Sequence, residues 1–182
     1  MKNNIARQSG GFTLIETLVA ISLLVVAIAA PMSLAAQSLS SAFYARDQIT
    51  AFHLAQEAVE AVRSVRDRNL LIALSGTPTD FIAGIPNTSG QPFTIDTRDN
   101  SMLICPNGVC PVLKNNSLLY GYGATPDWKD TRFTRIVRAT LVGGGADEAK
   151  IAVEVRWRSG AYQERNFTIN ENLYEWVSTG GI

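Results

Sequence analysis

The residue best placed for chemistry is a lone carboxylate beside an apolar stretch. Glu16 is followed by no charged residue before Arg46, and residues 18–36 are almost wholly aliphatic. An unpaired carboxylate costs about 2.5 to 3.5 kcal/mol at the centre of a membrane-spanning helix, and less near an interface. Cleavage between Gly11 and Phe12 would create an α-amine four residues before Glu16. That amine could neutralise the carboxylate, most usefully between subunits packed side by side.

Two thiols form a second candidate site. Cys105 and Cys110 are the only cysteines and enclose Pro-Asn-Gly-Val. In an oxidising compartment we expect them to form a disulfide, and the Asn-Gly pair favours the required turn. Closing so short a loop stabilises a fold by about 2 kcal/mol in the chain-entropy model. Half a zinc site is the alternative, but it lacks a second pair of ligands because the single histidine, His53, lies far away in the sequence.

Glu57 and Glu60 are the remaining candidates for acid–base or metal chemistry. Their spacing places them near one face of a helix, but nothing apolar or histidine-rich accompanies them. A solvated face with ion pairs, such as Glu60 with Arg63, is therefore the prediction. The sequence predicts no catalytic residue, metal, cofactor or small-molecule substrate. An extracellular enzyme on an N-terminal stalk is weighed and not favoured, because no catalytic constellation is recognisable.

The element that must position Glu16 is a membrane-competent helix. About 20 apolar residues in a helix cross a bilayer core of roughly 30 Å. Residues 1–11 carry Lys2 and Arg7 and no acid, which predicts a cytoplasmic N-terminus with the rest of the chain outside. Pro31 removes a backbone donor within the helix, so we expect a bend or local melting there.

This stretch resembles the prepilin signal of type IV pilins and type II secretion pseudopilins. A short basic leader ends in Gly11, then come Phe12-Thr13-Leu14-Ile15-Glu16 and the apolar run, with glycine, aromatic residue and glutamate at the family's spacing. The resemblance implies that a prepilin peptidase cleaves after Gly11 and methylates the amine of Phe12. It also implies that Glu16 pairs with this amine on an adjacent subunit, and that Pro31, slightly offset, is the helix-bending proline.

The same resemblance implies where the protein works and with what. Its partners would be other pilin or pseudopilin subunits, the prepilin peptidase, and the inner membrane with its assembly platform. The chain would start in the cytoplasmic membrane as a single-pass protein and end in a periplasmic or extracellular filament. The implied function is that of a structural subunit, a minor pilin or pseudopilin.

Two simpler interpretations of the N-terminus remain. A secretory signal peptide could end at Ser33-Leu34-Ala35-Ala36, but the apolar run exceeds the usual 7 to 15 residues and such a region rarely contains glutamate. A plain membrane anchor explains the length but not the combination of Gly11, Phe12 and Glu16. The alternative function is accordingly a secreted or membrane-anchored binding module.

Helical periodicity continues beyond the apolar run to about Leu70. Apolar residues at steps of three and four form one stripe, which we expect to face a sheet: Ala45, Ile49, Phe52, Ala55, Val59 and Val62. The helix, beginning at about Phe12, thus has a transmembrane half and an amphipathic half.

The rest of the chain predicts a small antiparallel sheet. Residues 73–131 are rich in turn formers, with short strands expected at 93–97 and 117–122. From Arg132 the period changes to two, which predicts a three-stranded meander. Its strands are expected at 132–142, 150–158 and 161–169, joined by a loose turn at 143–148 and a tight one at Ser159-Gly160. Its apolar face, Ile151, Val153, Val155 and Trp157, should cover the helix stripe.

The predicted fold class is α+β, a long N-terminal helix packed on a small antiparallel sheet. The expected organisation is a leader (1–11), a transmembrane assembly helix (12–36), an amphipathic helix (37–72), a connecting region with the disulfide loop (73–131), and a β-meander with a C-terminal tail (132–182).

Charge does not indicate a nucleic-acid partner. The chain has 16 basic and 16 acidic residues, so no global field attracts DNA. Alternation predicts that the arginines of the strands face water and are offset by Glu154, Asp147 and Glu164. These arginines are Arg132, Arg135, Arg138, Arg156, Arg158 and Arg165.

Overall fold

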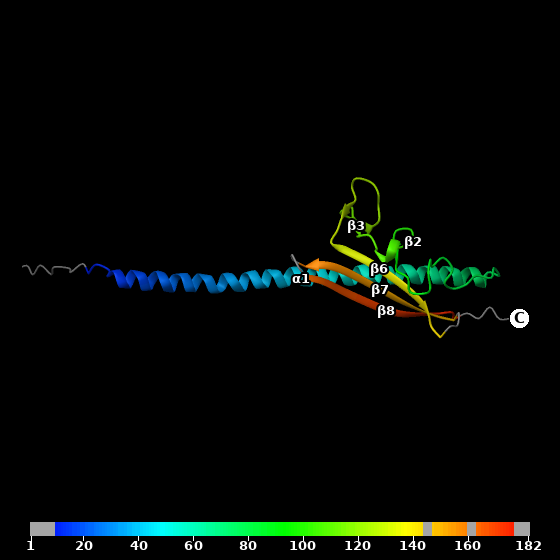
Figure 1. Cartoon of the computed structure of the whole chain (residues 1–182), viewed down its shortest axis with the longest axis horizontal. Helices are drawn as coiled ribbons and strands as arrows, with labels where there is room; N and C mark the ends of the chain where they lie inside the picture. Colours follow the sequence, from blue (N-terminus) through cyan, green and yellow to red (C-terminus); the bar gives the residue numbers. More distant parts are fainter. Residues whose placement is uncertain (1–9, 144–146, 160–162, 177–182) are drawn as a thin grey trace, which may run out of the picture. The chain divides into compact units, whose positions relative to one another are not determined.

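The structure is a computed structural model that describes residues 10–143, 147–159 and 163–176. The chain divides into two compact units, Met1–Ala45 and Arg46–Ile182. A single helix, α1 (Leu14–Leu74), belongs to both units (Figure 1). Within these described ranges, eight strands, all in the second unit, complete an α+β fold, as predicted.

Helix α1 ends four residues later than expected, for a local reason. Gly76 adopts φ +94°, the left-handed conformation that stops a helix. Its N–H donates to the carbonyl of Ala73, and the N–H of Thr77 donates to that of Ile72. These bonds satisfy carbonyls of the last turn, so the helix reaches Leu74 rather than ending near Leu70.

The larger sheet has five antiparallel strands in the order β2-β1-β6-β7-β8. Strands β6 (Phe133–Leu141), β7 (Glu148–Ser159) and β8 (Gln163–Tyr174) form the predicted meander. Strand β1 (Phe93–Asp96) was expected, whereas β2 (Ser101–Ile104) was not. A turn after β1 brings β2 back beside it, so β2 closes one edge of the sheet.

A second, three-stranded sheet lies in the connecting region, in the order β4-β3-β5. Its strands are β3 (Lys114–Asn115), β4 (Tyr120–Gly121) and β5 (Lys129–Asp130). The strand expected at 117–122 is wrong except for β4. Ser117 has φ 77°, and the side-chain oxygen of Asn116 accepts the N–H groups of Leu118 and Leu119, which makes a turn.

The third strand of the meander is longer than predicted. β8 pairs one-to-one with β7 as far as Tyr174, although the predicted strand ended at Ile169. Two asparagines, weak strand formers, follow Ile169, and the partner strand overrides their preference. Gly160 of the expected Ser159-Gly160 turn and residues 144–146 of the expected 143–148 turn lie outside the described residues.

The core lies between one face of this sheet and the C-terminal half of α1 (Figure 1). The predicted sheet face is confirmed, because Ile151, Val153, Val155 and Trp157 are all buried. On the helix only half of the predicted stripe is right. Ala55, Val59 and Val62 are buried, whereas Ala45, Ile49 and Phe52 are exposed.

Small residues explain the shifted helix face. Ala51, Ala55 and Ala58 are fully buried together with Leu54. Short side chains let a helix approach a sheet closely, and tight packing favours them at the contact. The predicted stripe gave too little weight to alanine, so it placed the buried face of α1 too far round the helix.

Candidate functional site

The residues that could be processed lie just ahead of α1. Gly10 to Thr13 are not helical, and Phe12 is 81% exposed. A Cβ atom placed on Gly11 would meet no atom within 4 Å. The peptide bond between Gly11 and Phe12 is therefore open to an enzyme, as exposed segments near a terminus are.

Thr13 sets the position of Glu16 in the first turn. Its Oγ1 accepts a hydrogen bond from the N–H of Glu16 at 3.3 Å, so Thr13 caps the helix. Thr-x-x-Glu is the sequence pattern of a capping box, and the helix dipole favours a carboxylate at this end. The side chain of Glu16 is exposed, and no cation of the described residues pairs with it. In the uncleaved chain the nitrogen of Phe12 is an uncharged amide, so it cannot neutralise the carboxylate of Glu16.

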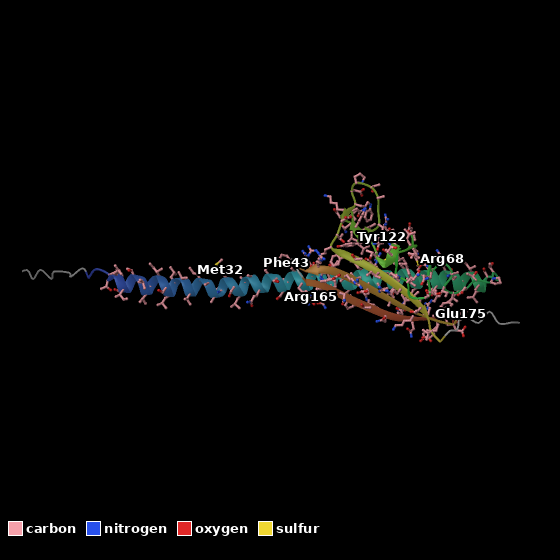
Figure 2. The ribbon with its side chains drawn as sticks, in the orientation of Figure 1. Met32, Phe43, Arg68, Tyr122, Arg165 and Glu175 are labelled. Carbon is pink, nitrogen blue, oxygen red and sulfur yellow. A yellow bond between two sulfur atoms is a disulfide. The ribbon has the colours of Figure 1, made fainter. Side chains whose placement is uncertain are left out.

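The helix beyond Glu16 presents an apolar surface that is not covered by any part of the chain that the structure describes. Every residue from 14 to 36 is exposed, and α1 is long and apolar enough to cross a membrane by length and composition. The hydroxyls of Thr17, Ser22 and Ser33 donate to carbonyls of their own helix at 2.6 to 2.8 Å. Such internal bonds make polar side chains compatible with lipid. Figure 2 shows the side chains, Met32 among them, projecting from the helix.

Pro31 lies inside α1, and the helix is continuous on both sides of it. The expected bend therefore stays a prediction.

Comparison with known proteins bears on this same segment. Residues 6–30 match the family model of the prokaryotic N-terminal methylation motif. The chain carries the type IV pilin and pseudopilin signal. The resemblance found in the sequence is thus confirmed, and the signal points to a type IV pilin-like or pseudopilin-like protein. No curated protein and no solved structure matches the chain.

The pilin signal fits the apolar helix that follows it, as in a membrane-anchored pilin. It implies, in general terms, interaction with other pilin subunits and with prepilin peptidase. The matched residues end at 30, so they include the predicted cleavage position and Glu16 but no part of the second unit.

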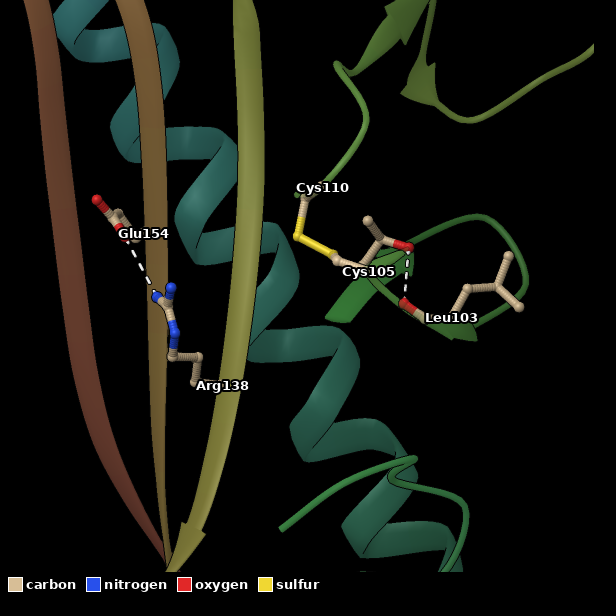
Figure 3. Close-up of a disulfide and its surroundings, with 6 residues drawn as sticks. Leu103, Cys105, Cys110, Arg138 and Glu154 are labelled. Carbon is tan, nitrogen blue, oxygen red and sulfur yellow. Dashed lines mark hydrogen bonds and ion pairs between the residues drawn. A yellow bond between two sulfur atoms is a disulfide. The ribbon is translucent and has the colours of Figure 1, made fainter. Parts of the chain in front are cut away.

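The predicted disulfide is present in the second unit. Cys105 and Cys110 are bonded, with Cα atoms 4.7 Å apart, around η1 (Pro106–Gly108) (Figure 3). Asn107 and Gly108 both have positive φ, as the Asn-Gly pair favours. The two sulfur atoms pack on Ile136 of β6, so the loop covers part of the sheet face opposite the helix. Bonded to each other, these sulfurs are not zinc ligands.

The carboxylates of α1 make ion pairs, as predicted. Glu60 binds Arg63, which also binds Glu171 of β8. Glu57 lies 3.6 Å from Arg135. Within the described ranges, no three His, Cys, Asp or Glu side chains gather as a metal site would require.

Arg135 contradicts the prediction that the strand arginines face water. It is 0% exposed, and its Nη1 and Nη2 donate to the carbonyls of Leu54 (3.2 Å) and Ile95 (2.6 Å). One guanidinium thus joins α1, β1 and β6. Its position shares the parity of Phe133 and Val137, which face the core, and this parity was the signal that could have revealed its burial.

Burial also shifts the pKa values around Arg135. Loss of hydration lowers the pKa of Arg135, opposed by nearby Tyr122 and Glu57. Burial raises the pKa of Tyr122 to about 12, although the positive charge of Arg135 opposes it. The Tyr122 hydroxyl makes no hydrogen bond of normal geometry to any described atom.

The other strand arginines behave more nearly as expected. On the sheet face opposite the helix, Glu154 accepts from Arg156 at 2.6 Å and from Arg138 at 3.3 Å. Figure 3 shows the Arg138–Glu154 pair. Arg132 donates to the buried Asp47 of α1 at 2.8 Å. These pairs offset much of the positive charge that nucleic acid would need.

Proposed function

We propose that this protein is a structural subunit, a minor pilin or pseudopilin, of a type IV pilus-like filament or type II secretion pseudopilus. The observation that carries the proposal is the combination of the methylation signal with an exposed apolar segment of α1, residues 14–36, whose one carboxylate, Glu16, pairs with no cation of the described residues. A helix of this kind needs lipid before assembly and other helices after it.

The proposed sequence of events starts in the cytoplasmic membrane, with the N-terminus inside. Prepilin peptidase removes the leader, residues 1–11, and methylates the amine of Phe12. The assembly platform then transfers the apolar helix from lipid into a helical bundle. There Glu16 pairs with the amine of Phe12 on a neighbouring subunit, because an unpaired ion is penalised in a low-dielectric bundle and a paired one is tolerated.

This pairing would set the axial register of the subunits. Only one offset between neighbouring helices brings the carboxylate to the amine. The Thr13 cap supports the role, because it holds Glu16 in the first turn, one turn from the new terminus. The bend expected at Pro31 would let the two halves of the helix follow different directions.

The first test is intact-mass and N-terminal peptide mass spectrometry on the chain expressed with and without a prepilin peptidase. The expected result is a mature chain beginning at methylated Phe12 only when the peptidase is present. A chain beginning near Gln37, or an uncut Met1 in both samples, would instead support the exported or membrane-anchored binding module.

A second test separates assembly from processing. Glu16→Ala should still be cleaved after Gly11 but should be lost from sheared filaments. Glu60→Ala is the matched control, because it removes an exposed carboxylate of the same helix and leaves Arg63 with Glu171. Normal incorporation of Glu16→Ala would refute the register role.

A further inference from the structure

The two edges of the five-stranded sheet run in the same direction. Each step in the order β2-β1-β6-β7-β8 is antiparallel, and four such steps make β2 and β8 parallel. Figure 1 shows them on opposite sides of the sheet. Among the described residues, β2 pairs only with β1 and β8 only with β7, so each strand has one free row of N–H and C=O groups.

The two edges are only partly protected against pairing: β2 is short, and β8 carries Glu164, Arg165 and Glu171 but has an uncharged segment at residues 166–169. β8 has 12 residues, no proline, and one-to-one pairing with β7 that leaves no bulge. Proteins usually protect such edges with charge, proline, bulges or short strands. β2 is short, but Leu103 is 72% exposed and Ile104 is 47% exposed on it. Uncovered aliphatic side chains on a free edge indicate a partner surface.

From this we propose that β8 of one copy pairs in parallel with β2 of a second copy, continuing the sheet from subunit to subunit. The inference rests on the proposed assembly role, because subunits that share one membrane or one filament share one polarity. Antiparallel pairing of β8 with a second β8 would invert one copy. Parallel pairing of β8 with β2 keeps both copies pointing the same way.

Side chains select one register for this contact. On β2, Met102 and Ile104 lie on the helix side of the sheet, opposite Ile95 and Phe93 of β1. On β8, Phe167 and Ile169 lie on the same side, opposite Val155 and Val153 of β7. Setting Met102 beside Phe167 puts Ile104 beside Ile169, so apolar side chains meet twice.

The residues on the opposite face agree with this register. It sets Leu103 beside Thr168 and Ser101 beside Asn166, with no charged residue in either four-residue segment. A shift of two residues one way would instead place Ile104 beside Glu171, and the other way Met102 beside Arg165. Both shifts bury a charge against an apolar side chain, which disfavours them.

The contact is heterologous, because each copy pairs through β8 with one neighbour and through β2 with another. A contact of this kind leaves a free β2 at one end and a free β8 at the other. It therefore repeats without closing unless the rotation forms a ring, and open repetition generates filaments.

The test is photo-crosslinking of the full chain in cells that contain the peptidase. p-Benzoylphenylalanine replaces Leu103 on β2, and in a control chain it replaces Thr140, an exposed residue of the central strand β6. The expected result is an adduct from position 103 to residues 166–169 of a second copy, and none from position 140. Adducts that join β2 to β2, adducts only to other proteins, or no adduct would overturn the inference.

A charge introduced on β8 provides a second test of the pairing. Thr168→Lys, in the chain that carries the crosslinker at position 103, should lower the adduct yield about fivefold, because a charge disfavours an uncharged paired edge. Thr140→Lys should leave the yield unchanged, and circular dichroism of both purified variants shows whether they fold. An unchanged yield with Thr168→Lys would contradict the pairing.

The outcome also distinguishes this inference from the function it rests on. A wild-type chain that is cleaved at Phe12 and assembled, yet gives no adduct between β2 and β8, contradicts only the sheet contact. A chain that is never cleaved at Phe12 contradicts the proposed function and removes the sheet contact with it.

Discussion

Single buried polar residues hold the second unit together, and Arg135 is the central one. Its two hydrogen bonds end on the carbonyls of Leu54 in α1 and Ile95 in β1, so one side chain of β6 links both elements. A guanidinium presents two donors in a fixed fork, whereas an ammonium is a single point. Arg135→Lys therefore leaves at least one buried carbonyl without its bond.

We expect Arg135→Lys to lower the free energy of unfolding by about 1 to 3 kcal/mol. Urea denaturation of the chain in detergent measures it. Arg138→Lys, at a partly exposed arginine paired with Glu154, is the matched control and should change stability by less than about 1 kcal/mol. Equal effects of the two variants would show that burial of Arg135 is not what matters.

Tyr122 makes stability depend on alkaline pH. Burial raises its pKa to about 12 from an ordinary value of 10. The folded chain therefore holds this proton more tightly than the unfolded chain, and the stabilisation is complete below pH 10 and lost as the pH rises to about 12. A rise of the pKa from 10 to about 12 corresponds to about 2 to 3 kcal/mol of folding stability.

Tyr122→Phe should remove that part of the alkaline destabilisation, because phenylalanine has no proton to lose. Unfolding followed by circular dichroism between pH 9 and pH 12 is the measurement. Tyr174→Phe, at an exposed tyrosine of β8, should retain the wild-type profile. Identical profiles for the wild type and Tyr122→Phe would contradict the assignment.

At the scale of elements, the alanine face of α1 determines how closely the helix and sheet pack. Ala58 is fully buried against the core. Ala58→Leu adds volume to a filled contact and should cost about 1 to 3 kcal/mol in unfolding free energy. Gln56→Leu places the same side chain on the exposed face and should leave the thermal midpoint nearly unchanged. A tolerated Ala58→Leu would mean that the packing has room to adjust.

The disulfide loop is the second such element. Replacing both cysteines, Cys105→Ser with Cys110→Ser, should lower stability by about 2 kcal/mol, because the closed loop is short. Reducing agent should lower the stability of the wild type by a similar amount and leave the double variant unchanged. If reduction also destabilises the double variant, the effect does not come from this bond.

For the whole molecule, the division into two units predicts independent folding of the second. No residue from 10 to 46 is buried, so the N-terminal part of α1 contributes nothing to the core. A chain beginning at Gln37 should be soluble without detergent and unfold within a few degrees of the full chain in detergent. Loss of the folded signal in the shortened chain would show that the core needs the N-terminal half of the helix.

Sequence alone determined the features that local pattern encodes. The methylation signal, the apolar helix, the Cys105–Cys110 loop and the alternating face of β7 each depend on neighbours within a few residues. Few local structures are compatible with a span of apolar residues, with a two-residue period or with a short loop between cysteines. These predictions therefore hold without knowledge of the fold.

Tertiary structure decided the features that depend on distant partners. β2 exists because β1 is there to pair with it, and β8 continues to Tyr174 because β7 does. Arg135 is buried because carbonyls from α1 and β1 receive it, and alanines of α1 face the core because the sheet lies close. In each case the stabilising free energy comes from contacts between segments far apart in the chain. The sequence of one segment alone does not encode these contacts.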